Sequence, residues 1–247
     1  MTVTLAHIWR HPVKSHGREE LSEVALIEGQ TMPWDRTWAV AHEGARTDGT
    51  EWARCANFSR GAKAPQLMAI DCKLDETSEA LTLSHPNRET VTLHPERDAP
   101  QFMDWVRPLM PENRAQSTHV VRVEGRGMTD TPFPSLSIAN IATHAAVEAQ
   151  LDTKLSMQRW RANLWLDGLE AWDEFNWVGK TLRIGEVEFS IEERITRCLA
   201  TTVNPETGER DSDTLGALKT WGHQDFGVYG VVKKSGAIRT GDKAQII

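Results

Sequence analysis

The chain contains, at positions 193–208, the stretch Glu193-Arg194-Ile195-Thr196-Arg197-Cys198-Leu199-Ala200-Thr201-Thr202-Val203-Asn204-Pro205-Glu206-Thr207-Gly208. An apolar strand pattern ends in this stretch, and Cys198 lies between the cation Arg197 and hydroxyl-bearing residues, just before a Pro/Gly turn. A neighbouring cation favours the thiolate, the form of cysteine that binds soft metals or attacks electrophiles. Most single cysteines are small buried apolar residues, so the local chemistry leaves two alternatives for Cys198, a structural residue or a reactive thiol.

Period-two patterns and β-branched residues on both sides of this stretch predict a chain built mainly of strands. The strands are expected at Val3–Trp9, Leu21–Ile27, Thr37–Ala41, Leu67–Leu74, Ala80–Leu83, Thr90–Leu93, His119–Glu124, Asn163–Leu166, Thr181–Ile184, Val187–Ile195, Phe226–Val232 and Ala244–Ile247. Helices are expected at Gln101–Leu109, at Ser137–Leu151 with Ser137 as the cap, and at Asp213–Thr220 with Asp211 or Ser212 as the cap.

This pattern predicts a mainly β, α+β protein, built from barrels or sandwiches with a few short helices. Gly125–Pro134 is rich in Gly, Thr, Asp and Pro and is expected to be a loop. The weakest join lies around residues 97–116, so we expect two domains, residues 1–110 and 111–247, that share an interface.

Composition excludes several classes of protein. A net charge of −7 argues against a dedicated nucleic-acid binder, which would usually be basic. The cysteines Cys55, Cys72 and Cys198 have no C-x-x-C spacing, so we expect neither a disulfide framework nor an iron–sulfur cluster in this chain, and Cys55 and Cys72 are expected to be structural. Without a signal pattern or a window near the ~18 apolar residues of a membrane span, we expect a cytoplasmic protein with no membrane partner.

Several cations lie beside predicted turns or strand ends in both halves of the chain. They are Lys14, which Ser15 follows, and Arg36, Arg54, Arg159, Arg161 and Arg197. Basic side chains, hydroxyls and free backbone N–H groups together form anion sites. The alternative is a set of solvated surface arginines in weak ion pairs.

Motifs spread over nearly the whole chain match one known family. In the C-terminal half they are Arg159-Trp160-Arg161-Ala162-Asn163-Leu164-Trp165-Leu166, Trp177-Val178-Gly179-Lys180-Thr181-Leu182-Arg183-Ile184-Gly185, Arg197-Cys198, Thr201–Gly208, Phe226-Gly227-Val228-Tyr229 and Gly241-Asp242. Because of these motifs, the C-terminal half of the chain resembles the MOSC domain, the module named after the C-terminal part of molybdenum-cofactor sulfurase. The N-terminal half, with His11-Pro12-Val13-Lys14-Ser15 and Asp35-Arg36-Thr37-Trp38, resembles the β-barrel domain that precedes MOSC in the mitochondrial amidoxime-reducing component and its bacterial relatives. The resemblance implies a small N-terminal β-barrel domain packed on a MOSC β-barrel.

The resemblance also implies a molybdenum cofactor, a pterin dithiolene with an anionic phosphate tail. The implied cofactor-binding residues are Lys14, Ser15, Arg36, Arg161, Asn163, Thr196 and Arg197, and the implied metal ligand and catalytic residue is Cys198. Ala162 stands within Arg-x-Asn where the mitochondrial proteins have proline, and Thr196 stands where they have serine. The region of Ser135 and Ser137 resembles the segment that lines the pterin pocket.

On this resemblance we expect an oxidoreductase that reduces N-hydroxylated small molecules by oxygen-atom transfer at a molybdenum held by Cys198. Because the chain ends at Ile247 without the ferredoxin-like domain of some bacterial relatives, we expect the electrons to come from a separate flavin or iron–sulfur reductase. Two alternatives stay open: a sulfur carrier or transferase that uses a Cys198 persulfide, and a non-catalytic cofactor-binding protein. Pyridoxal phosphate binding is an association of the family only.

Overall fold

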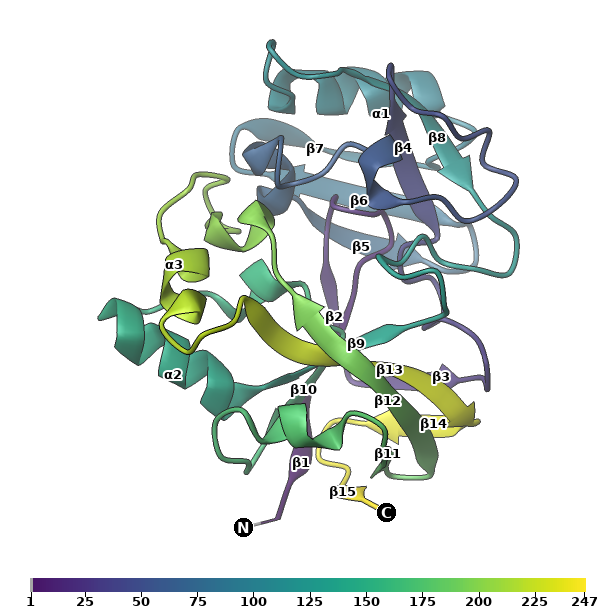
Figure 1. Ribbon diagram of the computed structural model, residues 1–247. Coiled ribbons are helices and arrows are strands. Elements are labelled where there is room, and N and C mark those ends of the chain that lie inside the picture. The colour runs from purple at the N-terminus through teal and green to yellow at the C-terminus, as the bar shows by residue number, and fades with distance from the viewer. Residues whose placement is uncertain (1) are drawn as a thin grey trace.

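The computed structural model describes residues 2–247, which fold mostly as β-strands with three α-helices (Figure 1). The strands are β1 (Thr4–Arg10), β2 (Glu19–Leu21), β3 (Glu23–Leu26), β4 (Trp38–His42), β5 (Asp71–Asp75), β6 (Ala80–His85), β7 (Arg88–Leu93), β8 (Ser117–Arg122), β9 (Leu136–Asn140), β10 (Leu164–Asp167), β11 (Thr181–Ile184), β12 (Val187–Thr196), β13 (Asp225–Lys234), β14 (Gly236–Arg239) and β15 (Ala244–Ile246). The helices are α1 (Ala99–Val106), α2 (Ile141–Leu151) and α3 (Thr214–Lys219), and short 3-10 helices lie at Cys55–Asn57, Pro65–Ala69, Arg107–Leu109, Met157–Trp160, Asp173–Trp177 and Leu199–Thr202. This content confirms the mainly β, α+β class.

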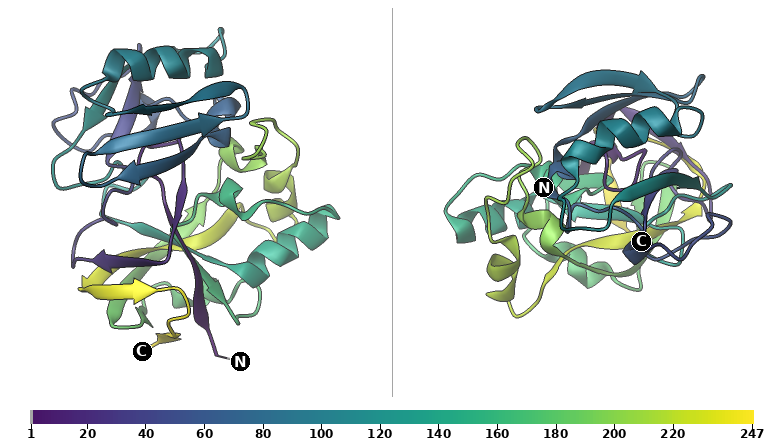
Figure 2. Two further views of the ribbon diagram at one scale, coloured as in Figure 1. Left: turned by 180° about the vertical axis from the view of Figure 1, so that it is seen from behind. Right: turned by 90° about the horizontal axis from the view of Figure 1, so that it is seen from above.

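The strands form two bodies, which lie one above the other in Figure 1. The lower body is built on an eight-stranded sheet in the order β15-β11-β12-β13-β9-β10-β1-β2, with the β14-β3 pair beside it. The upper body holds the three-stranded sheet β5-β6-β7, the β4-β8 pair and α1. Seen from behind, α2 covers one flank of the lower body and α1 lies across the top of the upper body (Figure 2). The arrangement confirms two β-rich units packed on each other.

The chain passes between the two bodies more than once. β1 belongs to the eight-stranded sheet, where Leu5 pairs with Leu166 and Ile8 pairs with Leu164 beside β10. Leu5 and Ile8 are fully buried in the same apolar core as Phe189 of β12. β8, which follows residue 110, pairs instead with β4 in the upper body. A single domain boundary at residue 110 therefore stays a prediction.

The helix expected from Ser137 begins four residues later, because Leu136–Asn140 forms strand β9. Asn140 caps α2 instead, and its side-chain oxygen accepts a hydrogen bond from the N–H of Ala142 at 2.9 Å. The prediction is wrong because every residue of β9 is buried. A strand covered on both faces shows no apolar–polar alternation, and its sequence then looks like part of a buried helix.

Two predicted strands change in a related way. Leu67–Leu74 divides into a 3-10 helix, Pro65–Ala69, and strand β5, because proline at the first helical position favours the tight turn. Leu21–Ile27 breaks at Ser22 into β2 and β3, which pair with different strands, β1 and β14. Local pattern detected these segments as extended, but their partners determine where each strand starts and stops.

The cap of α3 is Asp213 and not Asp211 or Ser212. The Asp213 carboxylate accepts a hydrogen bond from the N–H of Gly216 at 2.9 Å. Asp211 instead forms an ion pair with Arg159 at 3.2 Å, which ties the loop before α3 to the 3-10 helix Met157–Trp160. Because Asp211 pairs with Arg159, its carboxylate is not available to cap α3.

The turn Asn204–Gly208 joins the lower body to the upper one through hydrogen bonds. Gln66 donates from Nε2 to the carbonyl of Gly208 at 3.1 Å, and Arg18 donates from Nη2 to the carbonyl of Pro205 at 3.0 Å. Gly208 has φ +72°, and an added Cβ would lie 2.8 Å from Cα of Gln66. The Pro/Gly turn that follows Cys198 in sequence is thus explained by close backbone contact between the bodies.

We expect Gly208→Ala to lower the free energy of unfolding by more than the roughly 1–2 kcal/mol that the left-handed conformation alone costs, because the new methyl group would also collide with Gln66. Gly179→Ala is the matched control, since Gly179 has φ +81° with open space around it. Urea unfolding of both variants measures how much the contact between Gly208 and Gln66 contributes to the free energy of unfolding. Equal losses in the two variants would show that the contact with the upper body contributes nothing.

Candidate functional site

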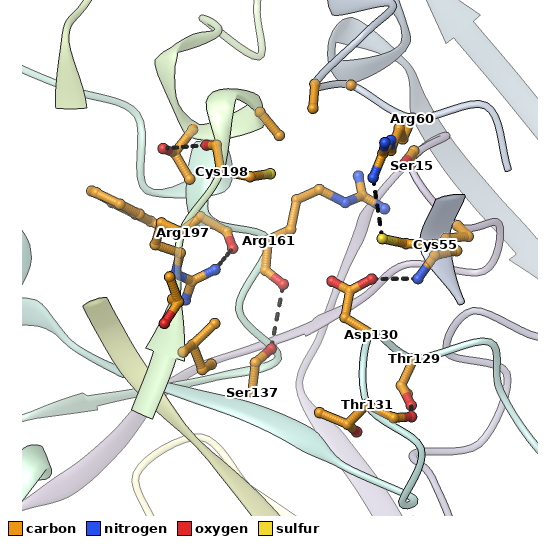
Figure 3. Close-up of a pocket in the computed structure, with 18 of the residues that line it drawn as sticks. Ser15, Cys55, Arg60, Thr129, Asp130, Thr131, Ser137, Arg161, Arg197 and Cys198 are labelled. Carbon is orange, nitrogen blue, oxygen red and sulfur yellow. Dashed lines mark hydrogen bonds and ion pairs between the residues drawn. The ribbon is translucent and has the colours of Figure 1, made fainter. Parts of the chain in front are cut away.

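A pocket of about 420 Å³ lies where the two bodies meet, and residues of both line it (Figure 3). It contains every residue that the sequence placed in the site, namely Lys14, Ser15, Arg36, Arg161, Asn163, Thr196, Arg197 and Cys198. Ser135 and Ser137 also line it, whereas Arg54 is not among the lining residues. The structure therefore brings together groups that are up to 184 residues apart in the chain, from Lys14 to Cys198.

Cys198 stands where the long strand β12 ends and the 3-10 helix Leu199–Thr202 begins. Its backbone is extended, with φ −122° and ψ 177°, and its carbonyl accepts hydrogen bonds from the N–H and hydroxyl of Thr201, both at 3.1 Å. The thiol is free and the residue is exposed. Figure 3 shows its sulfur on the pocket side. The sulfur is thus held by a fixed backbone and open to a ligand.

Arg161 reaches into the pocket from the turn after the 3-10 helix Met157–Trp160, with φ +50°. Its guanidinium donates to the carbonyls of Gly17 at 3.1 Å and Val13 at 3.5 Å, and its side chain is partly exposed. Burial first, and then the charge of Arg36, lower the pKa of Arg161 to about 9, so it stays protonated at neutral pH. Within residues 2–247 no carboxylate lies at ion-pair distance from it.

Arg197 is buried beneath Cys198 and also lacks a carboxylate partner in the described part of the chain. It donates from Nε and Nη2 to the carbonyl of Phe226 at 2.8 and 2.6 Å, and from Nη1 to the carbonyl of Trp160 at 2.8 Å. Its carbon Cζ also lies 5.7 Å from the centroid of the Trp160 ring. Burial lowers the pKa of Arg197 to about 10. These contacts anchor the strand end that carries the thiol, and they use three of the five N–H groups of the guanidinium.

Arg36 and Asp35 form a buried ion pair in the wall next to Arg161. Burial alone would raise the pKa of Asp35, but the charge of Arg36 and a hydrogen bond with His11 hold it well below its usual range. Arg36 also donates to the carbonyl of Arg161 at 3.0 Å and to Oδ1 of Asn163 at 3.4 Å. The pair therefore fixes the turn that presents the Arg161 guanidinium to the pocket.

Asn163 is almost fully buried and is bonded mostly to protein. Its amide nitrogen donates to the carbonyl of Trp9 at 3.1 Å, and its oxygen accepts from the N–H and hydroxyl of Ser137 at 3.0 and 2.9 Å. Its side chain thus joins β9 to β1 across the floor of the pocket. Thr196 is exposed, and its hydroxyl donates to Asp225 at 2.7 Å.

Sequence reasoning missed three kinds of lining residue. Asp130 forms an ion pair with Lys14 from inside the predicted loop Gly125–Pro134. Cys55, which we expected to be structural, lies in the pocket wall opposite Cys198 and accepts a hydrogen bond from Arg60 at 3.2 Å (Figure 3). The single tyrosine, Tyr229, also lines the pocket, and burial raises its pKa. Only Tyr229 carried a sequence signal, as the last residue of the Phe-Gly-Val-Tyr motif. By contrast Cys72, which we also expected to be structural, is buried and does not line the pocket.

Two buried histidines behind the pocket, His11 and His16, predict a loss of stability in mildly acidic solution. Burial lowers the pKa of His11 to about 3 and that of His16 to about 4, and the charge of Arg161 adds to both shifts. Both rings are therefore neutral in the folded protein and take up protons near the ordinary pKa of 6.5 only when the chain unfolds. The stabilisation is complete above pH 6.5 and should fall by up to roughly 1.4 kcal/mol per pH unit for each histidine as pH drops toward 4.

Urea unfolding at pH 7.5, 6, 5 and 4.5 measures this dependence directly. His16→Gln should reduce the slope, because the buried ring that resists protonation is gone. His119→Gln is the control, since His119 is exposed on β8 and forms no ion pair within residues 2–247. A free energy of unfolding that stays constant from pH 7.5 to 5 would contradict the prediction.

The fold and the site define a protein of two β-rich units with a cationic, thiol-bearing pocket at their junction. The family model described as "MOSC N-terminal beta barrel domain" matches residues 2–131, and the one described as "MOSC domain" matches residues 130–245. The chain belongs to the family of MOSC domain proteins that carry this N-terminal β-barrel domain.

Curated relatives support the same assignment. Mitochondrial amidoxime-reducing component 1 of Danio rerio is 30% identical to this chain, over 94% of the chain and 81% of that protein. Mitochondrial amidoxime reducing component 2 of Macaca fascicularis is 32% identical over 44% of the chain, and this match spans little more than a third of that protein, 37%. The YUAD protein from Bacillus subtilis shares the fold, with a TM-score of 0.51, 13% identity and coverage of 100% of this chain and 96% of that chain.

Across residues 2–247, none of the helices combines the length and apolar character that a membrane span needs.

Proposed function

We propose that the pocket binds a molybdenum cofactor and that the protein reduces N-hydroxylated compounds at a molybdenum ligated by Cys198. One observation carries the proposal: two guanidinium groups, Arg161 and Arg197, line a pocket without carboxylate partners in the described chain, beside an exposed thiol. Cations withdrawn from water without counter-charges are costly unless an anion completes the site. A thiolate next to such a site is a soft donor suited to molybdenum.

The residues present fit the proposed cofactor. Arg161 uses only two hydrogen bonds to protein, so it retains N–H groups for a phosphate. Ser15, with φ +64°, presents its hydroxyl and backbone at the same wall. Asn163 is satisfied by its protein partners, so we assign it the role of holding the floor in place and not that of a direct contact. The protein would thus provide an anion-binding site at Arg161 and Ser15, a soft metal ligand at Cys198, and a pocket wall that Asn163 holds in place.

The relatives named as amidoxime-reducing components direct the choice of substrate class. The overall reaction would convert an N–OH group to N–H, with two electrons and two protons consumed and one water released. When bound, the cofactor supplies the two-electron redox change and accepts the oxygen atom. The protein residues would position the cofactor, and the pocket cations would neutralise its negative charge. The electrons would come from a separate reductase, which is part of the proposal.

Metal analysis tests the proposal most directly. The protein should be expressed in a host that makes the cofactor, and molybdenum and pterin should then be found near one equivalent per chain. It should reduce a benzamidoxime with a chemically reduced viologen and fail to do so with NADH alone. Protein with one equivalent of pterin and no turnover under these conditions would support a non-catalytic binding protein instead, and protein without pterin would contradict the proposal.

A sulfur carrier is the second candidate, because the Cys198 thiol is free and exposed, and the neighbouring Leu199 is an apolar residue that is 50% exposed. A persulfide on this sulfur would be accessible to a second protein. Cyanide-labile sulfur in metal-free protein, lost in Cys198→Ser and retained in Cys55→Ser, would favour this function over the reductase.

A further inference from the structure

Asp130 is the carboxylate that the pocket itself supplies to its cations. It lies in the loop between β8 and β9, and the ammonium of Lys14 forms an ion pair with its Oδ1. Lys14 is almost fully buried and has one other acceptor, the carbonyl of Met128 at 2.8 Å. The Lys14 ammonium is therefore paired with Asp130, whose carboxylate is labelled among the pocket residues in Figure 3.

The position of Asp130 makes it a permanent anion at the surface of the pocket. Burial would raise its pKa, but the charges of Lys14, Arg36 and Arg161 and the hydrogen bond from Lys14 lower it to about 2. Its side chain nevertheless remains 55% exposed, so a ligand in the pocket can reach it. A ligand phosphate that approaches Lys14 would thus meet a like charge already bound there.

We propose that Asp130 is a resident counter-anion that competes with an incoming oxyanion for Lys14, and so limits the affinity of the pocket for highly charged ligands. The inference rests on the anion site of the proposed function and names the residue that tunes it. In the absence of ligand, Asp130 neutralises a buried ammonium that would otherwise have no counter-charge. When an oxyanion binds, the carboxylate must give up or share Lys14, and the repulsion between like charges opposes binding.

The charge dependence follows from Coulomb's law. The repulsion grows with the charge of the ligand, so Asp130 should penalise a dianion more than a monoanion. Asp130 therefore reduces the advantage that a dianionic phosphate otherwise has over a monoanion in a pocket lined by cations.

Binding of inorganic phosphate at pH 8 and of nitrate, measured by calorimetry on the metal-free full-length protein, tests the inference. Asp130→Asn should bind phosphate roughly 10-fold more tightly than the parent, with a smaller gain for nitrate. The control is Glu193→Gln, because Glu193 is the other carboxylate that lines the pocket among the described residues and no cation of that part of the chain forms an ion pair with it. Its phosphate affinity should stay within about twofold of the parent.

Each outcome decides something. A phosphate affinity that is unchanged or weaker in Asp130→Asn overturns the inference and leaves the anion site standing. An equal gain in Glu193→Gln also overturns it, because net charge alone would then explain the effect. If neither the parent nor any variant binds phosphate, the anion site of the proposed function falls as well. In a Lys14→Met background the gain from Asp130→Asn should shrink, because the competition for the ammonium is gone and only the repulsion between Asp130 and the phosphate is left. An undiminished gain in that background would overturn the competition for Lys14.

Discussion

Cys198→Ser is expected to lose nearly all bound molybdenum and, with it, N-hydroxylated substrate reduction. The serine hydroxyl is a harder donor than a thiolate and stays protonated at neutral pH, so it holds a soft metal poorly. Mutation of a residue that only supports a metal ligand commonly lowers metal affinity 10–100-fold. Loss of the ligand itself should therefore lower molybdenum affinity by more than about 100-fold. Stability should change by less than about 0.5 kcal/mol, since Cys198 is exposed and its backbone contacts do not involve the sulfur.

Molybdenum content per chain and the urea midpoint together measure this prediction. Cys55→Ser is the matched control, because it removes the other thiol that lines the same pocket. It should keep its molybdenum. Full metal content in Cys198→Ser, or equal loss in Cys55→Ser, would remove Cys198 from the proposed role as ligand.

The sequence predicted the outline of the fold because most strands have one covered and one open face. β6, for example, alternates between half-buried and buried residues along its length, and such alternation is visible in the sequence. β9 is buried throughout, so its pattern gave no period and its residues were assigned to the helix that follows. The division of the predicted strand Leu21–Ile27 into β2 and β3 was also out of reach, because β3 pairs with β14, more than 200 residues away, whereas β2 pairs with the nearby β1.

The candidate site was predictable as a set of residue types but not as a set of contacts. Cations on turns and a cysteine at a strand end marked the pocket, and the structure places them together. Which of their donors remain available depends on tertiary neighbours. Arg197 is occupied by backbone carbonyls of Phe226 and Trp160, whereas Arg161 retains free N–H groups. Asp130 lacked any local signal, since an aspartate in a Gly/Thr/Pro loop is ordinarily a turn residue.

Arg161→Met is expected to separate binding from stability. The variant should bind phosphate or the cofactor 10–100-fold more weakly, which corresponds to about 1–3 kcal/mol for a lost hydrogen bond to a charged group. Its free energy of unfolding should stay within about 1 kcal/mol of the parent or rise. Two hydrogen bonds, to Gly17 and Val13, are lost, but a partly buried cation without a carboxylate partner is lost with them.

Such an outcome would show that Arg161 contributes to ligand binding and not to the stability of the fold. Functional sites commonly lower the stability of a protein in this way. Calorimetric binding and urea unfolding are measured on the same samples. Arg161→Lys should show intermediate binding, because it restores the charge but not the planar fork. Arg107→Met is the control for loss of a cation, since Arg107 is exposed and pairs with Asp104 outside the pocket. If Arg161→Met loses several kcal/mol of stability and keeps its affinity, Arg161 is a structural residue, and the anion-binding site must come from Lys14 and Arg36.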